Sequence, residues 1–214
     1  MGSVLYSNCR IKHLTKTLKI LIVLGSMLLY IPVNRFISGG STLKFVLDSF
    51  IPLTPVFVIP YLSGLLFWLA TVIYINLKQV GEQVLRFNFM MILAGILSVL
   101  IYILLPTFMN RPAIIDNDIF SRILSWVYAT DRAYNAAPSG HTFYTIICFL
   151  ALWKVAPKYR TVWTIISILI IASTLFTKQH NVLDVLLGTG FAMLIYLVSA
   201  KGKLITIKYY GGEC

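Results

Sequence analysis

The sequence contains few charged residues. Only 12% of its 214 residues are Asp, Glu, Lys or Arg, whereas soluble domains usually carry about 25%. Hydrophobic residues make up 58% of the chain, and the mean hydropathy is +0.85. So few charges do not cover a water-facing surface, and so apolar a chain is not intrinsically disordered. The composition therefore predicts an integral membrane protein.

Cysteine and histidine are also scarce. The three cysteines, Cys9, Cys148 and Cys214, form no spaced pair or cluster, which argues against a disulfide framework and a thiolate metal site. Three histidines leave little material for a multi-histidine metal centre. The sequence therefore predicts neither a bound metal ion nor a cofactor.

Long uncharged runs recur along the chain, several close to the ~20 residues that a membrane-spanning helix needs. The shorter runs gain length because flanking Lys and Arg side chains can reach the membrane interface. We predict one all-α membrane domain over 1–214, a bundle of six transmembrane helices. Their expected bounds are 18–36, 54–77, 86–107, 141–155, 161–177 and 181–200. An interfacial helix is expected at 41–50 and an outer loop at 108–140.

The basic residues fall unevenly on the two sides of this topology. With the N-terminus inside, 6 of the 18 Lys and Arg residues lie outside and the remaining 12 inside. An excess of Lys and Arg is typical of cytoplasmic loops. The outer six are Arg35, Lys44, Arg111, Arg122, Arg132 and Lys178. Both termini are therefore predicted to be cytoplasmic, in a multi-pass protein of the cell membrane. The net charge of +11 then indicates orientation and attraction to anionic membrane lipids, and nucleic acid is not an expected partner.

Three polar clusters stand at the ends of predicted helices, at 106–112, 134–142 and 178–184. The topology brings all three to the outer face, which predicts one shared site. In the last cluster, His180 and Asp184 are four residues apart, a spacing that places them on one face of a helix. The carboxylate would hold one ring nitrogen and leave the other free to attack or to accept a proton. A structural pair that closes a helix end is the alternative.

The second cluster has the pattern of a helix start. Ser139 is a good N-cap, and Gly140 leaves room for a ligand to approach the free N–H groups, which suit an anion. His141 in the first turn is placed to protonate a leaving oxygen. The alternative is an ordinary capped helix with an interfacial histidine.

Arg111 ends the first cluster and has a planar guanidinium that suits bidentate phosphate binding, although an arginine that reaches to the interface is the alternative. Two histidines, a carboxylate and an arginine on one face match a phosphoryl-transfer site. Most aromatic residues at the helix ends, Tyr61 and Trp68 among them, are expected to form interfacial belts.

Taken together, these motifs resemble those of the phosphatidic acid phosphatase type 2 superfamily of integral membrane enzymes. They are Arg111-Pro112, Pro138-Ser139-Gly140-His141 and His180-x3-Asp184. The resemblance covers roughly 85–200 and implies metal-independent phosphoryl transfer. It implies that His180 is the nucleophile, which forms a phosphohistidine and is oriented by Asp184, and that His141 is the general acid. The phosphate binders that it implies are Arg111, Ser139 and Gly140.

Two departures from the family pattern remove phosphate-binding cations. Leu104 stands where the first motif has a lysine, and Thr174 stands where the third motif has an arginine. Lys178 is a hypothetical replacement for one of them. The chain is similar to the subgroup of inositol phosphorylceramide synthases and sphingomyelin-synthase-like proteins in three stretches, Leu-Leu-Pro-Thr, Tyr-Asn-Ala-x-Pro-Ser and Thr-Lys-Gln-His. In that subgroup a lipid or polyol hydroxyl can replace water as the acceptor.

The leading expectation is a phosphatase that acts on a lipid phosphate at the extracytoplasmic face. The first alternative is a lipid phosphotransferase with a lipid or polyol acceptor, and the second is a non-catalytic lipid-binding or transport protein. The two missing cations favour the non-catalytic protein. The histidines and the carboxylate favour an enzyme, because binding alone needs no nucleophile. Serine proteolysis at Ser139 lacks any second signature.

Overall fold

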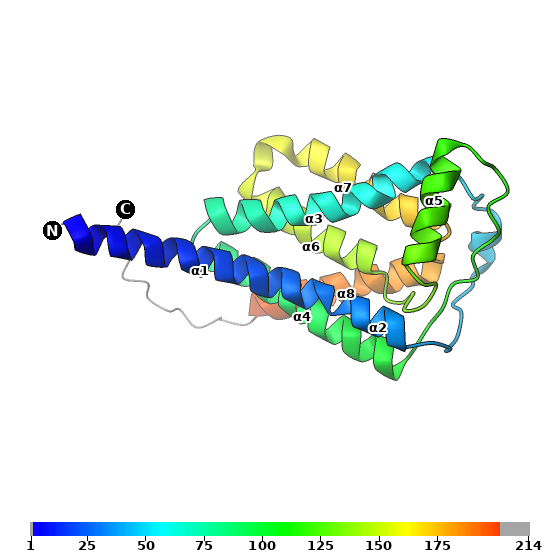
Figure 1. Ribbon diagram of the computed structural model, residues 1–214, viewed down its shortest axis with the longest axis horizontal. Coiled ribbons are helices and arrows are strands. Elements are labelled where there is room, and N and C mark those ends of the chain that lie inside the picture. The colour runs from blue at the N-terminus through cyan, green and yellow to red at the C-terminus, as the bar shows by residue number, and fades with distance from the viewer. Residues whose placement is uncertain (1, 202–214) are drawn as a thin grey trace.

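Helices make up most of the chain. The computed structural model describes residues 2–201, with side chains from 15 to 200. In these residues there is no strand, only two isolated β-bridges. The α-helices are α1 (Gly2–Leu28), α2 (Tyr30–Phe36), α3 (Val58–Lys78), α4 (Glu82–Leu104), α5 (Ile119–Thr130), α6 (Gly140–Val155), α7 (Arg160–Phe176) and α8 (Val182–Lys201). Three short 3₁₀ turns, η1 (Val46–Ser49), η2 (Pro55–Phe57) and η3 (Pro157–Tyr159), lie between them (Figure 1).

Five helical stretches of the described chain are long and apolar enough to cross a membrane. They are Thr15–Phe36, Pro55–Lys78, Glu82–Leu104, Pro157–Phe176 and Val182–Ala200. The remaining predicted span, 141–155, corresponds to α6, whose 16 residues reach only about 24 Å, against a hydrocarbon core of about 30 Å. The all-helical membrane fold is therefore confirmed, and the count of six spans stays a prediction.

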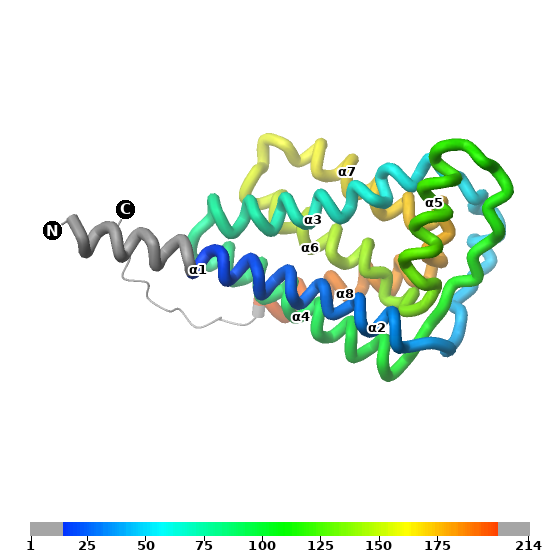
Figure 2. Tube along the Cα trace, viewed as in Figure 1, coloured from blue at the N-terminus to red at the C-terminus, as the bar shows by residue number. Residues whose placement is uncertain are grey.

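The helices pack around α6, which contacts α3, α4, α7 and α8. The core between them buries large side chains such as Phe87, Met91 and Ile147, each at most 1% exposed. In Figures 1 and 2, the described part of α1 starts and α8 ends at the same end of the bundle, opposite the end that carries α5. The two ends of the helical bundle therefore differ: α1 begins and α8 ends at one of them, and loops and α5 cover the other.

Helix α5 was not expected inside the predicted outer loop 108–140. It begins because the Asp118 side chain accepts hydrogen bonds from the backbone N–H groups of Phe120 and Ser121. Its buried Leu124 and Val127 pack against the start of α3. One apolar face is enough to hold this helix across the end of the bundle, although the surrounding segment is polar.

The segment 41–50, called the strap below, also differs from the expected interfacial helix. It contains only the 3₁₀ turn η1 and lies against the start of α8. Asp48 makes this attachment: Oδ2 accepts from the N–H of Phe45 at 2.6 Å, and Oδ1 accepts from the N–H of Val182 at 2.8 Å. The strap therefore fixes the connection between α7 and α8.

Candidate active site

A cavity of about 610 Å³ lies in the half of the bundle near α5. Its walls come from α1, α2, α3, α4, α5, the start of α6 and the turn that precedes α8. One end is polar and is lined by Arg111, Asp131, Arg132, Asn135, Gly140, His141, Gln179 and His180. All three sequence clusters are near this cavity, and two of its lining residues are the predicted histidines.

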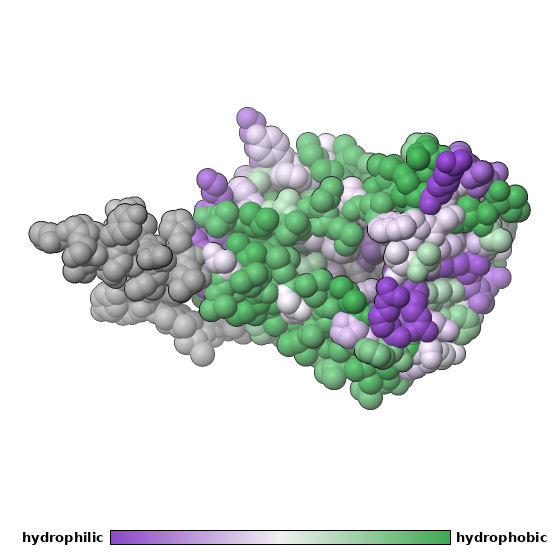
Figure 3. Space-filling model, viewed as in Figure 1, coloured by the Kyte–Doolittle hydropathy of each residue, from purple (hydrophilic) through white to green (hydrophobic). Residues whose placement is uncertain are grey.

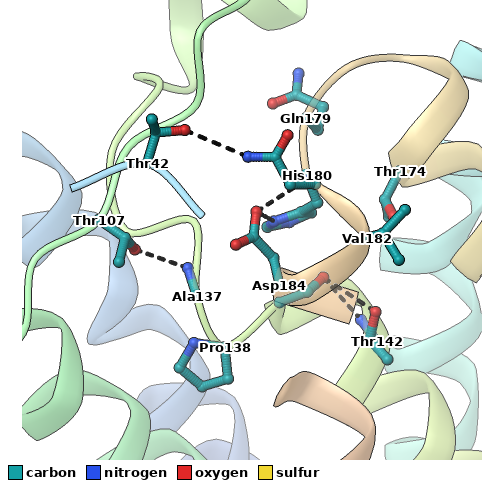
Figure 4. A network of polar contacts seen from close by, with 12 residues as sticks. Thr42, Thr107, Ala137, Pro138, Thr142, Thr174, Gln179, His180, Val182 and Asp184 are labelled. Carbon is teal, nitrogen blue, oxygen red and sulfur yellow. Dashed lines mark hydrogen bonds and ion pairs between the residues drawn. The ribbon is translucent and has the colours of Figure 1, made fainter. Parts of the chain in front are cut away.

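His180 and Asp184 form a pair at the start of α8 (Figure 4). His180 Nδ1 lies 3.7 Å from Asp184 Oδ2, which also accepts from the N–H of Asn181 at 2.8 Å. The helix begins only at Val182, so the pair does not share a helical face as the spacing predicted. The carboxylate instead reaches back over the first turn, and it leaves Nε2 as the ring nitrogen available to a ligand.

The start of α6 packs against this turn. The N–H of Ser139 donates to the backbone oxygen of Asp184 at 3.0 Å, and Ser139 Oγ accepts from the N–H of Thr142 at 3.3 Å. The predicted N-cap is therefore confirmed. A Cβ at Gly188 would lie 2.8 Å from the backbone oxygen of Ser139, so glycine permits this close approach of α6 and α8. Ser139 is fully buried and does not line the cavity, whereas Gly140 does.

His141 is held by aromatic rings from α3. The Tyr61 ring stacks on the imidazole at a centroid distance of 4.0 Å, and Trp68 meets it edge-on at 4.9 Å. Trp68 is itself fixed, because Nε1 donates to Thr145 Oγ1 at 3.0 Å. Tyr61 and Trp68 are 4% and 5% exposed, so for these two residues the expected interfacial belt is wrong. The imidazoles of His141 and His180 face the same space, with centroids 6.4 Å apart.

Arg111 lines the cavity from the loop between α4 and α5. Its guanidinium donates to the backbone oxygen of Asp131 at 2.6 Å and to Gln179 Oε1, and it stacks 4.8 Å above the ring of Tyr128. Burial raises the pKa of Tyr128 to about 12, an effect that Arg111 opposes. The phenol therefore stays protonated and donates to the backbone oxygen of Thr177 at 2.8 Å. These contacts orient the arginine without neutralising it by an ion pair.

Several buried polar atoms at this end have no hydrogen-bond partner among the described residues. They are Arg111 Nε, His141 Nε2, Gln179 Nε2 and both amide atoms of Asn135. Buried polar groups are normally paired, so an unpaired set around one cavity indicates a polar ligand. The guanidinium and the two imidazoles are suited to an anion with several oxygens, such as a phosphate.

Aliphatic and aromatic side chains make up most of the remaining lining of the cavity. Its aliphatic lining comes mainly from α1, α2 and α3: Leu24, Met27, Leu28, Ile31, Leu62 and Leu65. Leu28 and Leu65 are 58% and 52% exposed, so this lining continues onto the outer surface. Figure 3 shows a hollow there, between the apolar surfaces of α1 and α3. The cavity is thus open sideways, at the level of the apolar helices.

Lys178 lies outside this cavity lining. Its Nζ donates to the backbone oxygen of Asp48 at 3.0 Å. Burial lowers the pKa of Lys178, an effect that Asp48 opposes. The hypothesis that Lys178 replaces a missing phosphate-binding cation stays a prediction, and this placement gives it no support.

The cavity is also lined by residues that were not predicted as site residues. Tyr61, Asn135 and Gln179 line it, and the only sequence signal for the last two is that they lie near Pro138 and beside His180. Among the side chains from 15 to 200, no three or more His, Cys, Asp or Glu residues are grouped as metal ligands. The metal independence implied by the resemblance stays a prediction.

Comparison with known proteins gives one match. The family model of the PAP2 superfamily matches residues 83–204, which is more than half of the chain. No curated protein and no solved structure matches. The matched range contains the predicted motifs from Arg111 to Asp184, and it begins after α3.

Proposed function

Because the chain belongs to the PAP2 superfamily of membrane phosphatases and phosphotransferases, we propose that it is a lipid phosphatase. The family resemblance is confirmed, whereas the subgroup stays a prediction. The observation that carries the proposal is the cavity itself, which joins a polar end with two histidines and an arginine to an aliphatic wall open sideways. A lipid phosphate has the same two parts, a phosphoryl group and an apolar tail.

The first chemical step forms a phosphohistidine. Arg111 and the N-terminal end of α6 at Gly140 bind the phosphoryl oxygens. His180 Nε2 attacks phosphorus while the bond from phosphorus to the lipid oxygen breaks, and Asp184 stabilises the positive charge that develops on the ring. Protonated His141 gives its proton to the leaving oxygen, so the lipid alcohol departs uncharged.

The second step returns the enzyme to its starting state. Water attacks the phosphorus of the phosphohistidine and passes its proton to His141 as the bond from nitrogen to phosphorus breaks. Inorganic phosphate then leaves. The stacked ring of Tyr61 at 4.0 Å supports this double role, because a fixed imidazole stays within reach of both oxygens.

The site is proposed to face the extracytoplasmic side. The support is the distribution of charge: most of the Lys and Arg residues within 2–201 lie in segments at the opposite end of the bundle, and such residues are enriched in cytoplasmic loops. A lipid in that leaflet reaches the site through the sideways opening, with its tail against the aliphatic wall.

Purified protein in phospholipid nanodiscs tests the proposal. With phosphatidic acid as substrate, the wild-type protein should release inorganic phosphate, and rapid quenching should trap an acid-labile, base-stable phosphoryl group on the protein. His180→Ala should abolish both signals. Wild-type turnover in His180→Ala would show that the mechanism is wrong. Tight binding of lipid phosphates without release of phosphate, across a panel of head groups, would instead support the non-catalytic alternative.

A further inference from the structure

The side-chain amide of Asn135 has no hydrogen-bond partner in the described chain, and the proposed hydrolysis of a phosphate does not use it. The side chain lines the cavity and is 2% exposed, yet Oδ1 and Nδ2 both have no partner in the described chain. Burial of an unpaired amide is costly and therefore uncommon. An amide left open on a cavity wall indicates a ligand that supplies both a donor and an acceptor.

The backbone holds this amide in place. The N–H of Asn135 donates to the backbone oxygen of Thr107 at 2.8 Å, and the N–H of Met109 donates to that of Ala133 at 2.8 Å. This short pairing includes the β-bridge between Phe108 and Tyr134. Asn135 adopts a φ of 61°, a region that asparagine tolerates better than most residues.

Asp131 lines the same cavity, close to the reaction centre. Its Oδ1 accepts from Tyr30 Oη at 2.7 Å, and its Oδ2 lies 3.4 Å from Tyr61 Oη. The ring of Tyr61 stacks on His141, so one tyrosine separates this carboxylate from the general acid. A carboxylate has about four acceptor positions, so both oxygens can accept a further hydrogen bond.

We propose that Asn135 and Asp131 form a subsite for an alcohol hydroxyl beside the phosphate. The inference rests on the phosphoryl transfer proposed above. The oxygens of Asn135 and Asp131 are hydrogen-bond acceptors and repel a phosphate dianion, whereas a hydroxyl donates to one of them and accepts from Asn135 Nδ2. The ligand class is therefore an alcohol or a polyol, either a free acceptor or the head group of the donor lipid.

As an acceptor, the bound alcohol takes the place of water in the second step. Its oxygen forms a bond to the phosphorus of the phosphohistidine while the bond to His180 breaks. The proton of the reacting hydroxyl, which in a polyol such as glycerol is adjacent to the hydroxyl held by the subsite, passes to His141, and a phosphate ester of the alcohol leaves in place of inorganic phosphate. No other reactant is needed.

The partition between the two products tests an acceptor. With phosphatidic acid as donor and increasing glycerol, wild-type protein should yield glycerol phosphate beside inorganic phosphate. Asn135→Gly, which removes the amide and fits the φ of 61° without strain, should lower the ratio of ester to phosphate at least about tenfold, because a lost hydrogen bond in a buried site costs about that much. Asn135→Asp, which keeps Oδ1, is a second variant if the first does not fold.

Ser167→Ala is the matched control. Ser167 Oγ on α7 is also buried without a partner, but it does not line the cavity. This variant should leave the ratio of ester to phosphate unchanged.

A second arm distinguishes a head group from a free acceptor. Without glycerol, the KM for phosphatidic acid is compared with that for phosphatidylglycerol phosphate, whose glycerol carries a free hydroxyl. If the subsite binds the head group, Asn135→Gly raises the KM only for the second lipid. The proposed subsite is wrong if Asn135→Gly changes neither the ratio of ester to phosphate nor the ratio of the two KM values. It is also wrong if the wild-type protein forms no glycerol phosphate and shows no preference between the two lipids. His180→Ala distinguishes a failure of the subsite proposal from a failure of the proposed function, because retained turnover in that variant contradicts the proposed function itself.

Discussion

Two parts of the chain build the cavity from different kinds of side chain. Residues 83–204, which the family model matches, supply both histidines, Arg111 and the open amides. Residues 15–82 precede the match and supply most of the aliphatic wall. Under the proposed function, the matched part performs the chemistry, while the part before it admits and holds the apolar portion of the substrate.

The earlier part also positions two groups of the matched part. Tyr61 stacks on His141, and Asp48 accepts from the N–H of Val182, two residues after His180. We therefore expect the loss of kcat to depend on which of these groups is changed. Changes in the chemical groups should cost most in kcat, changes in their supports should cost less, and changes in residues that face away from the cavity should cost least.

After the complete loss expected for His180→Ala, the largest effect is expected for His141→Ala. Loss of a general acid should lower kcat for phosphatidic acid by about 10²–10⁴-fold. The loss in kcat/KM, which reports the first step, should be far smaller with p-nitrophenyl phosphate, because its leaving group departs without a proton. Steady-state kinetics with both substrates measures the contrast. Equal losses with the two substrates would remove the general-acid role of His141.

A smaller effect is expected for Tyr61→Ala, which removes the stacked ring. Aromatic stacking is worth about 0.5–1.5 kcal/mol, so kcat should fall about tenfold, while Tyr61→Phe keeps the stack and should retain most of the activity. Tyr74→Ala is the control on the same helix, because Tyr74 is 37% exposed and does not line the cavity. A loss in Tyr61→Phe as large as in Tyr61→Ala would assign the effect to the hydroxyl.

A further decrease in effect is expected for Asp48→Ala. The variant loses the bond to the start of α8, and a lost helix cap costs about 0.5–2 kcal/mol. We expect a lower melting temperature and a kcat lowered a few-fold. Asp118→Ala removes the equivalent cap of α5 and should lower the melting temperature without changing kcat. If both variants lower kcat alike, the strap has no specific role at His180.

The helices could be predicted largely from apolar runs, because in a membrane protein composition alone marks the segments that face lipid. Helix α5 could not, since its stability comes from Leu124 and Val127 packing against α3 inside a segment that is polar on average. The predicted pair of His180 and Asp184 is present, but it forms by a carboxylate that reaches back over a helix start. A spacing of four residues does not distinguish these two geometries.

Residues that support the site were harder to predict. Tyr61 and Trp68 have the sequence pattern of interfacial aromatics, and only the packing of α3 against α6 decides that they meet His141. Asp48 and Val182 are 134 positions apart, so no local pattern connects them. Contacts of this kind depend on the assembled fold.

The smallest effect is expected for Lys178→Ala, which tests how the site replaces the cations missing at Leu104 and Thr174. Because Lys178 Nζ donates to the backbone of Asp48, its removal should change the affinity for vanadate by less than about twofold, whereas Arg111→Ala should weaken it about tenfold or more, as expected for a charged hydrogen bond to an anion. Isothermal titration of both variants with vanadate measures the difference. Unchanged affinity in Lys178→Ala leaves Arg111, the histidines and the start of α6 as the phosphate binders. A tenfold loss with an unchanged melting temperature would instead mean that the Lys178 side chain leaves the strap and turns toward the substrate. The strap, which precedes the family match, would then release Lys178 as a phosphate binder.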